Sequence, residues 1–425
     1  MSAKDVVHWG GLAHLIKGLV YLKKNRKKYF LAVASAAVSL FAVNAILEIV
    51  ARVQESEYLV SRLTALEMET RDTGAVFDPR TKMVVVRDLR SAGHDIYPSL
   101  YTHDILENQT FEEKVSGRIL VPLGFKSRTA FVFCNELGRH SIWKSDRYGF
   151  YNEDEAYWGA SKSSERTAVL IGDSMVAGAC VEQGEDIASR LREQNIRAIS
   201  LGIPGAGPIR ELATFREYAL PLQPDVIVWF FSELNDLVDA ITESRDPFLR
   251  QYLKPTFRQD LLEKQTDIDR TWGEFLVARM QEQEPPERSA GKNFQDMLRR
   301  LMPYTTLYQV RSRLALTRGA FRDAEAVELV RNILKEVKAI SEDHNIDLVL
   351  AYLPRREAFI SKDLSTHGHI RDIASSLNIP FISIREVFLS EGDPLRFFPR
   401  PRIFPHYRPE GYQVVAEAVV RHLGK

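Results

Sequence analysis

From residue 161 to the C-terminus, short apolar runs alternate with longer segments in which apolar residues recur at helical spacing. The apolar runs are TAVLIG (167–172), AISLG (198–202), DVIVWFF (225–231), DLVLAYLP (347–354) and PFISI (380–384). The segments with helical spacing are 185–194, 208–219, 325–344, 365–377 and 409–423. A short, nearly continuous apolar run is typical of a parallel strand buried on both faces. The alternation therefore predicts an α/β domain over 161–425, built as a three-layer structure around a parallel sheet.

The interval between the third and fourth predicted strands is much longer than a connection in such a domain requires. Most of it, from Phe248 to Asp323, is rich in charged residues and helix formers. We interpret residues 245–324 as a helical insertion that either caps an edge of the sheet or covers the active site.

The segment that precedes the α/β domain, residues 52–160, has a different pattern, in which strand-like runs are separated by turn residues. The runs are MVVVRDL (83–89), RILVPLGF (118–125) and RTAFVFCN (128–135). We expect a β-rich N-terminal segment here, either as a small subdomain or as a wrap around the main domain.

Near the N-terminus, a basic run at 23–28 is followed by a stretch without charged residues at 29–47. A helix of this length is about as long as the apolar core of a bilayer is thick. We predict one transmembrane helix over 29–51, with residues 1–28 as a cytoplasmic basic segment, because Lys and Arg favour the cytoplasmic side. In a bacterial cell the rest of the chain then lies in the periplasm, anchored to the inner membrane. A cleaved signal peptide and a buried core helix are the alternatives.

Charge and cysteine content narrow the possible functions. Lys+Arg and Asp+Glu both number 57, so the formal net charge is zero and a nucleic-acid partner is not expected. Cys134 and Cys180 are the two cysteines. In an oxidising compartment an even number favours a disulfide, and two buried free thiols are the alternative. Neither cysteine belongs to a C-x-x-C pair, which argues against a zinc site.

Ser174 is the first candidate for chemistry, since Gly172-Asp173-Ser174 directly follows the first predicted strand. Ligands bind at the carboxyl ends of the strands in open α/β sheets, so this hydroxyl is expected to face the binding crevice. A serine that merely caps a helix is the alternative.

Two further elements follow the next two predicted strands. LGIPGAGP (201–208) is a glycine-rich turn after the second strand, and Asn235 follows the third. The backbone N–H groups of Ser174 and Gly205 and the amide of Asn235 are three donors that can converge on a developing negative oxygen. Gly205 as an ordinary turn residue and Asn235 as a helix N-cap are the alternatives.

His406 precedes the last predicted helix. An imidazole can accept the proton of a serine hydroxyl near neutral pH and pass it to a leaving group. We therefore interpret His406 as a general base, the alternative being a structural histidine in a proline-rich loop.

Together, the GDS triplet, the glycine turn, the asparagine and this histidine resemble the four sequence blocks of SGNH (GDSL) hydrolases. The resemblance covers residues 165–245 and 345–423. It implies a flavodoxin-like sheet, Ser174 as nucleophile toward an ester, His406 as base, and an oxyanion hole formed by Ser174, Gly205 and Asn235. It implies no organic cofactor and no metal ion.

A narrower resemblance is carried by the predicted anchor, the CNE…SDRYGFYN stretch (134–152) and GDSMVAGACV. These features are similar to membrane-anchored SGNH proteins linked to bacterial cell-surface polysaccharide. Polysaccharide-synthesis machinery is accordingly an expected partner.

One position departs from the family pattern, which places an aspartate three residues before the histidine to orient the imidazole. Here that position is Ile403. A Ser–His dyad, a backbone carbonyl or a carboxylate from elsewhere can take over this role. Asp393, in the same loop, is our candidate for the displaced acid.

Three functions fit these features. The first is an esterase or deacetylase acting on O-acyl groups of an extracytoplasmic glycan through an acyl-enzyme on Ser174. The second is an O-acyltransferase that moves an acyl group onto a cell-surface polysaccharide with the same nucleophile. The third is a non-catalytic glycan-binding or assembly protein on a degenerate hydrolase fold.

Overall fold

The structure, a computed structural model, describes residues 26–73, 76–99, 113–115, 118–154, 166–282, 322–361, 364–400 and 404–424. The chain forms two compact units. One unit comprises residues 1–60 and 285–320, and what is described of it is the first part of a long helix. The other unit comprises residues 61–284 and 321–425 and contains the sheet that carries the predicted site.

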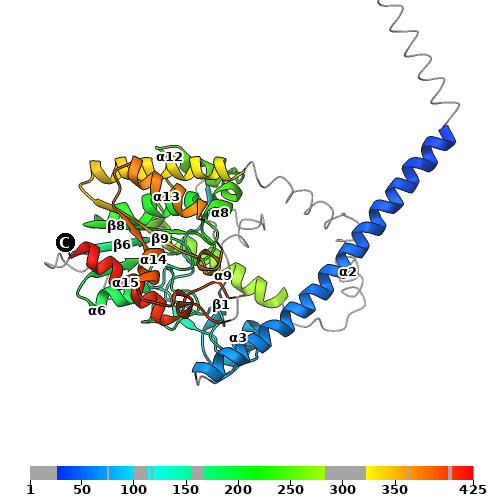
Figure 1. The fold of residues 1–425 in the computed structure, drawn as a ribbon, viewed down its shortest axis with the longest axis horizontal. Helices are drawn as coiled ribbons and strands as arrows, with labels where there is room; N and C mark the ends of the chain where they lie inside the picture. Colours follow the sequence, from blue (N-terminus) through cyan, green and yellow to red (C-terminus); the bar gives the residue numbers. More distant parts are fainter. Residues whose placement is uncertain are drawn as a thin grey trace, which may run out of the picture. The chain divides into compact units, whose positions relative to one another are not determined.

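A five-stranded parallel sheet forms the centre of the larger unit (Figure 1). Its strands are β6 (Thr167–Ile171), β7 (Arg197–Ser200), β8 (Val226–Ser232), β9 (Asp347–Leu353) and β10 (Phe381–Ser383). They lie in the order β10-β9-β8-β6-β7, and each neighbouring pair is parallel. In chain order this is the 2-1-3-4-5 arrangement of flavodoxin-like folds. The predicted α/β fold is confirmed, and the strands nearly coincide with the five predicted apolar runs.

Helices cover both faces of this sheet, which gives three layers (Figure 1). Successive side chains of a strand point to opposite faces. Trp229 and Phe231 of β8 accordingly belong to one hydrophobic core, whereas Val228 and Phe230 belong to the other. The first core includes residues of α7 (Pro208–Thr214), α8 (Asp236–Glu243), α12 (Arg322–Asp343) and α13 (Ser365–Ser376). The second includes residues of α6 (Ile187–Glu193), α14 (Ile384–Ser390) and α15 (Pro409–Leu423).

The segment before the sheet contains short strands and one helix. β1 (Ile96–Pro98), β4 (Ala130–Val132) and β5 (Ile142–Lys144) form a three-stranded sheet, and β2 (Glu113–Val115) pairs with β3 (Arg118–Leu120). The interpretation of 83–89 as a strand is wrong, because these residues lie in helix α3 (Lys82–Ser91). Val85, Val86 and Leu89 pack into one small core with residues of β1 and β4, so their spacing is that of a helix face.

The described part of the predicted insertion packs against this N-terminal segment. It contains η4 (Leu249–Leu253), η5 (Leu261–Lys264) and α9 (Gln265–Glu282). The indole N–H of Trp272 donates to the carbonyl of Gly124 at 2.9 Å, and the N–H of Val121 donates to Gln259 Oε1 at 2.9 Å. Residues 283–321 of the insertion lie outside the described residues.

Helix α2 (Arg26–Thr73) continues well past residue 51, where we predicted a membrane helix to end. Within the part of the chain that the structure describes, no helix has both the length and the apolar character needed to cross a membrane. The transmembrane prediction for 29–51 is therefore not supported. Residues 1–25 of the predicted cytoplasmic segment lie outside the described residues.

The predicted disulfide between Cys134 and Cys180 is confirmed, with the two Cα atoms 5.0 Å apart. It links the N-terminal segment to the turn that follows β6. Ser174 lies in the same turn. The disulfide therefore ties this turn to the N-terminal segment, although the first strand of the sheet lies between the two in the sequence.

Candidate active site

Ser174 lies in the turn directly after β6, at the carboxyl edge of the parallel sheet. The turn is held by Asp173, whose Oδ1 accepts the backbone N–H of Met175 at 2.9 Å. The loop after β7 passes very close to it. A Cβ atom on Gly202 would lie 2.3 Å from the backbone nitrogen of Ala177, so only glycine fits there. The turn that carries Ser174 and the neighbouring loop are thus fixed against each other.

The strand order places one predicted oxyanion donor on each side of Ser174. Gly205 follows β7 and Asn235 follows β8, and these are the two strands paired with β6. Gly205 has a φ of +72°, which glycine adopts without strain. Asn235 occupies the N-cap position of α8, as the alternative interpretation has it, but its side chain makes no capping hydrogen bond. Its amide donates to Asp239 Oδ2 at 2.6 Å, which leaves the second amide hydrogen for another acceptor.

His406 is buried in the loop before α15 and meets Ser174 directly. Its Nε2 lies 3.0 Å from the Ser174 hydroxyl oxygen, within hydrogen-bond distance. The following residue anchors the loop, because the hydroxyl of Tyr407 donates to the carbonyl of Pro354 at 2.7 Å. The structure therefore brings together a hydroxyl and an imidazole that lie on distant parts of the chain.

The other side of the imidazole is occupied by Glu136 from the N-terminal segment. Glu136 Oε1 lies 2.9 Å from His406 Nδ1, and Oε2 accepts the backbone N–H of His406 at 3.2 Å. This hydrogen-bond network assigns the ring hydrogen to Nδ1 and leaves Nε2 free to accept the Ser174 proton. Ser174, His406 and Glu136 thus have the relative arrangement of a serine, its base and an orienting carboxylate.

Asp393 does not take the place that we predicted for it. It is exposed, and its Oδ1 accepts the N–H of Leu395 at 3.0 Å at the start of the short helical segment η8 (Pro394–Phe397). The proposed displaced acid is therefore corrected to Glu136. Proximity in the sequence was misleading, because the carboxylate that reaches the imidazole lies in another segment of the fold.

Several contacts hold Glu136 in position. The disulfide fixes Cys134, two residues before it. Asn135 donates its amide to the carbonyl of Asp78 at 3.0 Å, and its own carbonyl accepts from Arg62 Nη2 of α2 at 3.3 Å. Glu136 is itself buried, with 7% of its surface exposed. The carboxylate is therefore held by a loop that is fixed at the two residues directly before it.

The electrostatic surroundings of His406 favour the protonated ring. Burial alone would lower its pKa, since it disfavours the charged imidazolium. The negative charge of Glu136, its hydrogen bond and a smaller contribution from Asp173 outweigh burial, so the pKa of His406 is raised above its usual value of 6.5. These surroundings therefore stabilise an imidazolium at position 406.

Three buried carboxyl groups lie beneath the site and do not take part in this contact chain. They are Asp173, Glu211 and Asp236, and each is at most 1% exposed. Burial raises the pKa of all three, and the mutual repulsion of their charges raises the pKa of Glu211 and Asp236 further. Each of these carboxyl groups therefore ionises less readily than the same group in water.

One residue of the site, Glu136, was missed at the level of the sequence. A signal was nevertheless present, because the predicted disulfide already connects residue 134 to residue 180, which is close in the sequence to Ser174. Any carboxylate next to Cys134 was therefore a candidate for the missing acid, and Glu136 is the acidic residue of the Cys134-Asn135-Glu136 stretch.

No protein-family model matches the chain, and no curated protein matches it. Solved structures with a similar fold include a G-D-S-L family protein from Desulfitobacterium hafniense, at 14% identity and a TM-score of 0.33. An acetyl xylan esterase has 13% identity and a TM-score of 0.34, and a lipase/acylhydrolase from Enterococcus faecalis has 12% identity and a TM-score of 0.34. The matches cover 60%, 60% and 61% of this chain and 99%, 99% and 95% of those chains, respectively.

Proposed function

We propose that this chain is a serine ester hydrolase in which Ser174 is the nucleophile, His406 the general base and Glu136 the carboxylate that orients the imidazole. The observation that carries the proposal is the continuous contact from Glu136 through His406 to Ser174, at 2.9 Å and 3.0 Å. The three groups lie at the carboxyl edge of a parallel sheet, where α/β folds bind their ligands.

The arrangement supports acyl transfer in two steps. Ser174 Oγ bonds to the ester carbonyl carbon while its proton passes to His406 Nε2, and the carbonyl electron pair moves onto oxygen. The backbone N–H groups of Ser174 and Gly205 and the amide of Asn235 donate to that oxyanion. The tetrahedral intermediate then expels the alcohol, which takes the proton from the imidazolium, and water repeats the sequence on the acyl-enzyme.

The test is hydrolysis of p-nitrophenyl acetate by the full chain. We expect Ser174→Ala to lower turnover by at least about 10³-fold, because the nucleophile is removed. The matched control is Ser390→Ala, since Ser390 is exposed and its hydroxyl donates to the carbonyl of Val387, outside the site. A fluorophosphonate probe should label the wild type at Ser174. Wild-type turnover in Ser174→Ala, or a lack of labelling, would overturn the proposal.

The finer proposal is that the ester is an O-acyl group of an extracytoplasmic glycan. The resemblance in the sequence motivates the glycan, and the Cys134–Cys180 disulfide supports an oxidising compartment. Release of acetate from O-acetylated oligosaccharides tests it. Turnover restricted to p-nitrophenyl and lipid esters would reject the glycan but not the hydrolase.

An O-acyltransferase is the second candidate, and burial of the site favours it. Ser174 is 8% exposed and His406 is 7% exposed, so access of water to an acyl-enzyme is restricted. With an acetyl donor and an oligosaccharide acceptor, mass spectrometry should detect acetylated acceptor. Hydrolysis of the donor without transfer would reject this candidate.

The non-catalytic alternative loses its main support, because Glu136 compensates for the departure at Ile403.

A further inference from the structure

Three side chains that can bind a metal ion meet on the far side of the imidazole from Ser174. Cys180 Sγ lies 3.6 Å from His406 Nδ1, and Glu136 Oε1 lies 2.9 Å from the same nitrogen. The ligand atoms of the three residues all lie within 4.8 Å of one another, and all three residues are buried. In the oxidised protein Cys180 is bonded to Cys134 and offers no thiolate.

We propose that reduction of the Cys134–Cys180 disulfide creates a Zn²⁺ site formed by Cys180, His406 and Glu136. One thiolate, one imidazole and one carboxylate are three ligand types that zinc prefers. The consequence for activity that we derive below rests on the proposed hydrolase, whereas the metal site itself does not.

The observed spacing suits tetrahedral zinc. With usual Zn–S and Zn–N bond lengths, a sulfur and a nitrogen on one tetrahedral zinc lie about 3.6 Å apart, and a nitrogen and an oxygen about 3.4 Å. The sulfur–nitrogen distance of 3.6 Å already matches this expectation. The nitrogen–oxygen distance of 2.9 Å must open by a few tenths of an ångström, since the hydrogen bond between them is replaced by two bonds to the metal.

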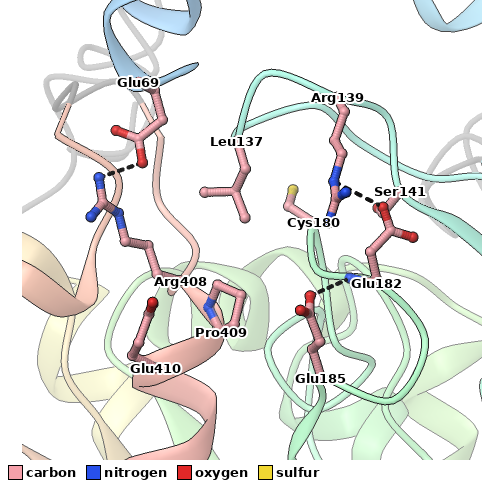
Figure 2. Close-up of a pocket in the computed structure, with 10 residues that line it drawn as sticks. All are labelled: Glu69, Leu137, Arg139, Ser141, Cys180, Glu182, Glu185, Arg408, Pro409 and Glu410. Atoms are coloured by element: carbon pink, nitrogen blue, oxygen red, sulfur yellow. Dashed lines mark hydrogen bonds and ion pairs between the residues drawn. The ribbon is translucent and has the colours of Figure 1, made fainter. Parts of the chain in front are cut away.

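The fourth ligand is expected to be water from an adjacent cavity. A cavity of about 340 Å³ is lined by Cys180, Leu137 and Arg408, and Figure 2 shows the Cys180 side chain on its wall. Glu182 and Glu185 lie on the same side of this cavity, and Glu69 forms an ion pair with Arg408 across from them (Figure 2). The cavity thus gives solvent, a small reductant and a hydrated cation a route to the sulfur.

The chemistry of formation balances with a dithiol as the reductant. The dithiol gives two hydrogens to the protein disulfide, which becomes two thiols, and is itself oxidised to a disulfide. Zinc then displaces the Cys180 thiol proton, which leaves to solvent. One thiolate and one carboxylate neutralise the charge of the buried Zn²⁺, so no net charge is buried.

Zinc at this position would stop the proposed reaction. In the resting triad the ring hydrogen is on Nδ1, and Nε2 accepts the proton of Ser174. Metal coordination at Nδ1 moves that hydrogen to Nε2, because a neutral imidazole carries one hydrogen. Nε2 is then a donor, so it cannot accept the serine proton.

The experiment compares Cys134→Ala with Cys180→Ala in the full chain. Both variants lack the disulfide in the same way, but only Cys134→Ala retains the Cys180 thiol. After incubation with Zn²⁺ and gel filtration, we expect one equivalent of zinc on Cys134→Ala and on dithiothreitol-reduced wild type. We expect none on Cys180→Ala or on the oxidised wild type. Co²⁺ in place of zinc should give a thiolate-to-cobalt charge-transfer absorption in the same two samples.

Equal zinc content in Cys134→Ala and Cys180→Ala would overturn the proposal. A Cys134→Ala/His406→Ala double variant that binds as much zinc as Cys134→Ala would also overturn it. Circular dichroism shows whether the variants fold, and if Cys134→Ala does not, reduced wild type provides the same comparison against Cys180→Ala. Metal content is measured without any substrate, so a failure of the hydrolase proposal leaves this result intact. If the hydrolase proposal holds, zinc should inhibit ester hydrolysis by Cys134→Ala, and a chelator should restore it. Zinc should not change the activity of Cys180→Ala.

Discussion

Both carboxylate oxygens of Glu136 contact His406: Oε1 lies 2.9 Å from ring Nδ1, and Oε2 accepts the backbone N–H at 3.2 Å. The two contacts fix the position of the loop and the orientation of the ring together. A carboxylate three residues before the histidine, as in the family pattern, would be part of the same loop. Here the carboxylate that contacts the imidazole comes instead from a segment that precedes the whole sheet.

Glu136→Gln should lower kcat/KM by about 10²- to 10⁴-fold, because the neutral amide neither stabilises the imidazolium nor enforces the tautomer with hydrogen on Nδ1. Steady-state kinetics with p-nitrophenyl acetate measure this. Asp393→Asn is the matched control, and its activity should equal that of wild type because Asp393 only caps η8. If Asp393→Asn lost activity and Glu136→Gln kept it, Asp393 would be the acid and Glu136 would have no part in the mechanism.

The pH dependence of kcat/KM should report the raised pKa of His406. The base must be neutral to accept the serine proton, so activity should rise with pH through a midpoint above the ordinary 6.5. Glu136→Gln removes the charge that raises this pKa, and the residual activity should therefore have its midpoint at lower pH. A midpoint that stays unchanged in the variant would show that Glu136 does not set the pKa.

Glu211→Gln should make the protein more stable at neutral pH. Burial raises the pKa of Glu211 well above 4.5, so the folded state holds its proton while the unfolded state releases it. The free energy of unfolding must then fall as pH rises above 4.5, by at most about 1.4 kcal/mol per pH unit from this group. Glu211→Gln has no titratable group at this position, so the loss of stability with rising pH that Glu211 causes disappears.

Urea unfolding at several pH values between 4.5 and 8 measures this difference. Glu391→Gln, at an exposed position, is the control and should follow the wild-type pH dependence. An unchanged slope in Glu211→Gln would mean that Glu211 is charged in the folded protein at neutral pH.

Gly202→Ala should lower both activity and stability. The added Cβ would lie 2.3 Å from the nitrogen of Ala177 and 2.6 Å from the carbonyl carbon of Val176, so the nucleophile turn must move. Overpacking of this kind costs about 1–3 kcal/mol. Gly368→Ala in α13 is the control, since its Cβ would meet nothing within 4 Å and should stabilise the helix by about 0.5–1 kcal/mol. Thermal unfolding should show a lower midpoint for Gly202→Ala and a higher one for Gly368→Ala, and turnover should fall in Gly202→Ala alone. A fully active Gly202→Ala would contradict the close approach.

The sheet and much of the candidate site were predictable because their signals are local. Buried parallel strands are nearly continuous apolar runs, and the residues that follow them meet at one edge whatever the loops between them do. Ser174, Gly205 and Asn235 were found in this way, and the structure places them after three adjacent strands. His406 was found because it lies after the last predicted strand and just before the last helix, α15.

Glu136 and α3 were not predictable from local patterns. The contact between Glu136 and His406 joins residues 270 positions apart, and no periodicity encodes it. In α3, a run of three valines has strong strand propensity, but packing of Val85, Val86 and Leu89 against β1 and β4 decides for a helix. Tertiary contacts determine both features, and in α3 they override a local preference for a strand.

The origin of Glu136 has a consequence for how this protein can be divided. A cut at residue 160, where the composition changes from the N-terminal segment to the α/β domain, would retain the serine and the histidine but discard the carboxylate and one half of the disulfide. The hydrolase-like region is therefore not a transferable module by itself. Gene fusions, truncations or recombination between relatives that respect the apparent boundary would leave the imidazole without its carboxylate, and would also remove residues of the core on one face of the sheet, among them Phe131, Trp143 and Phe150.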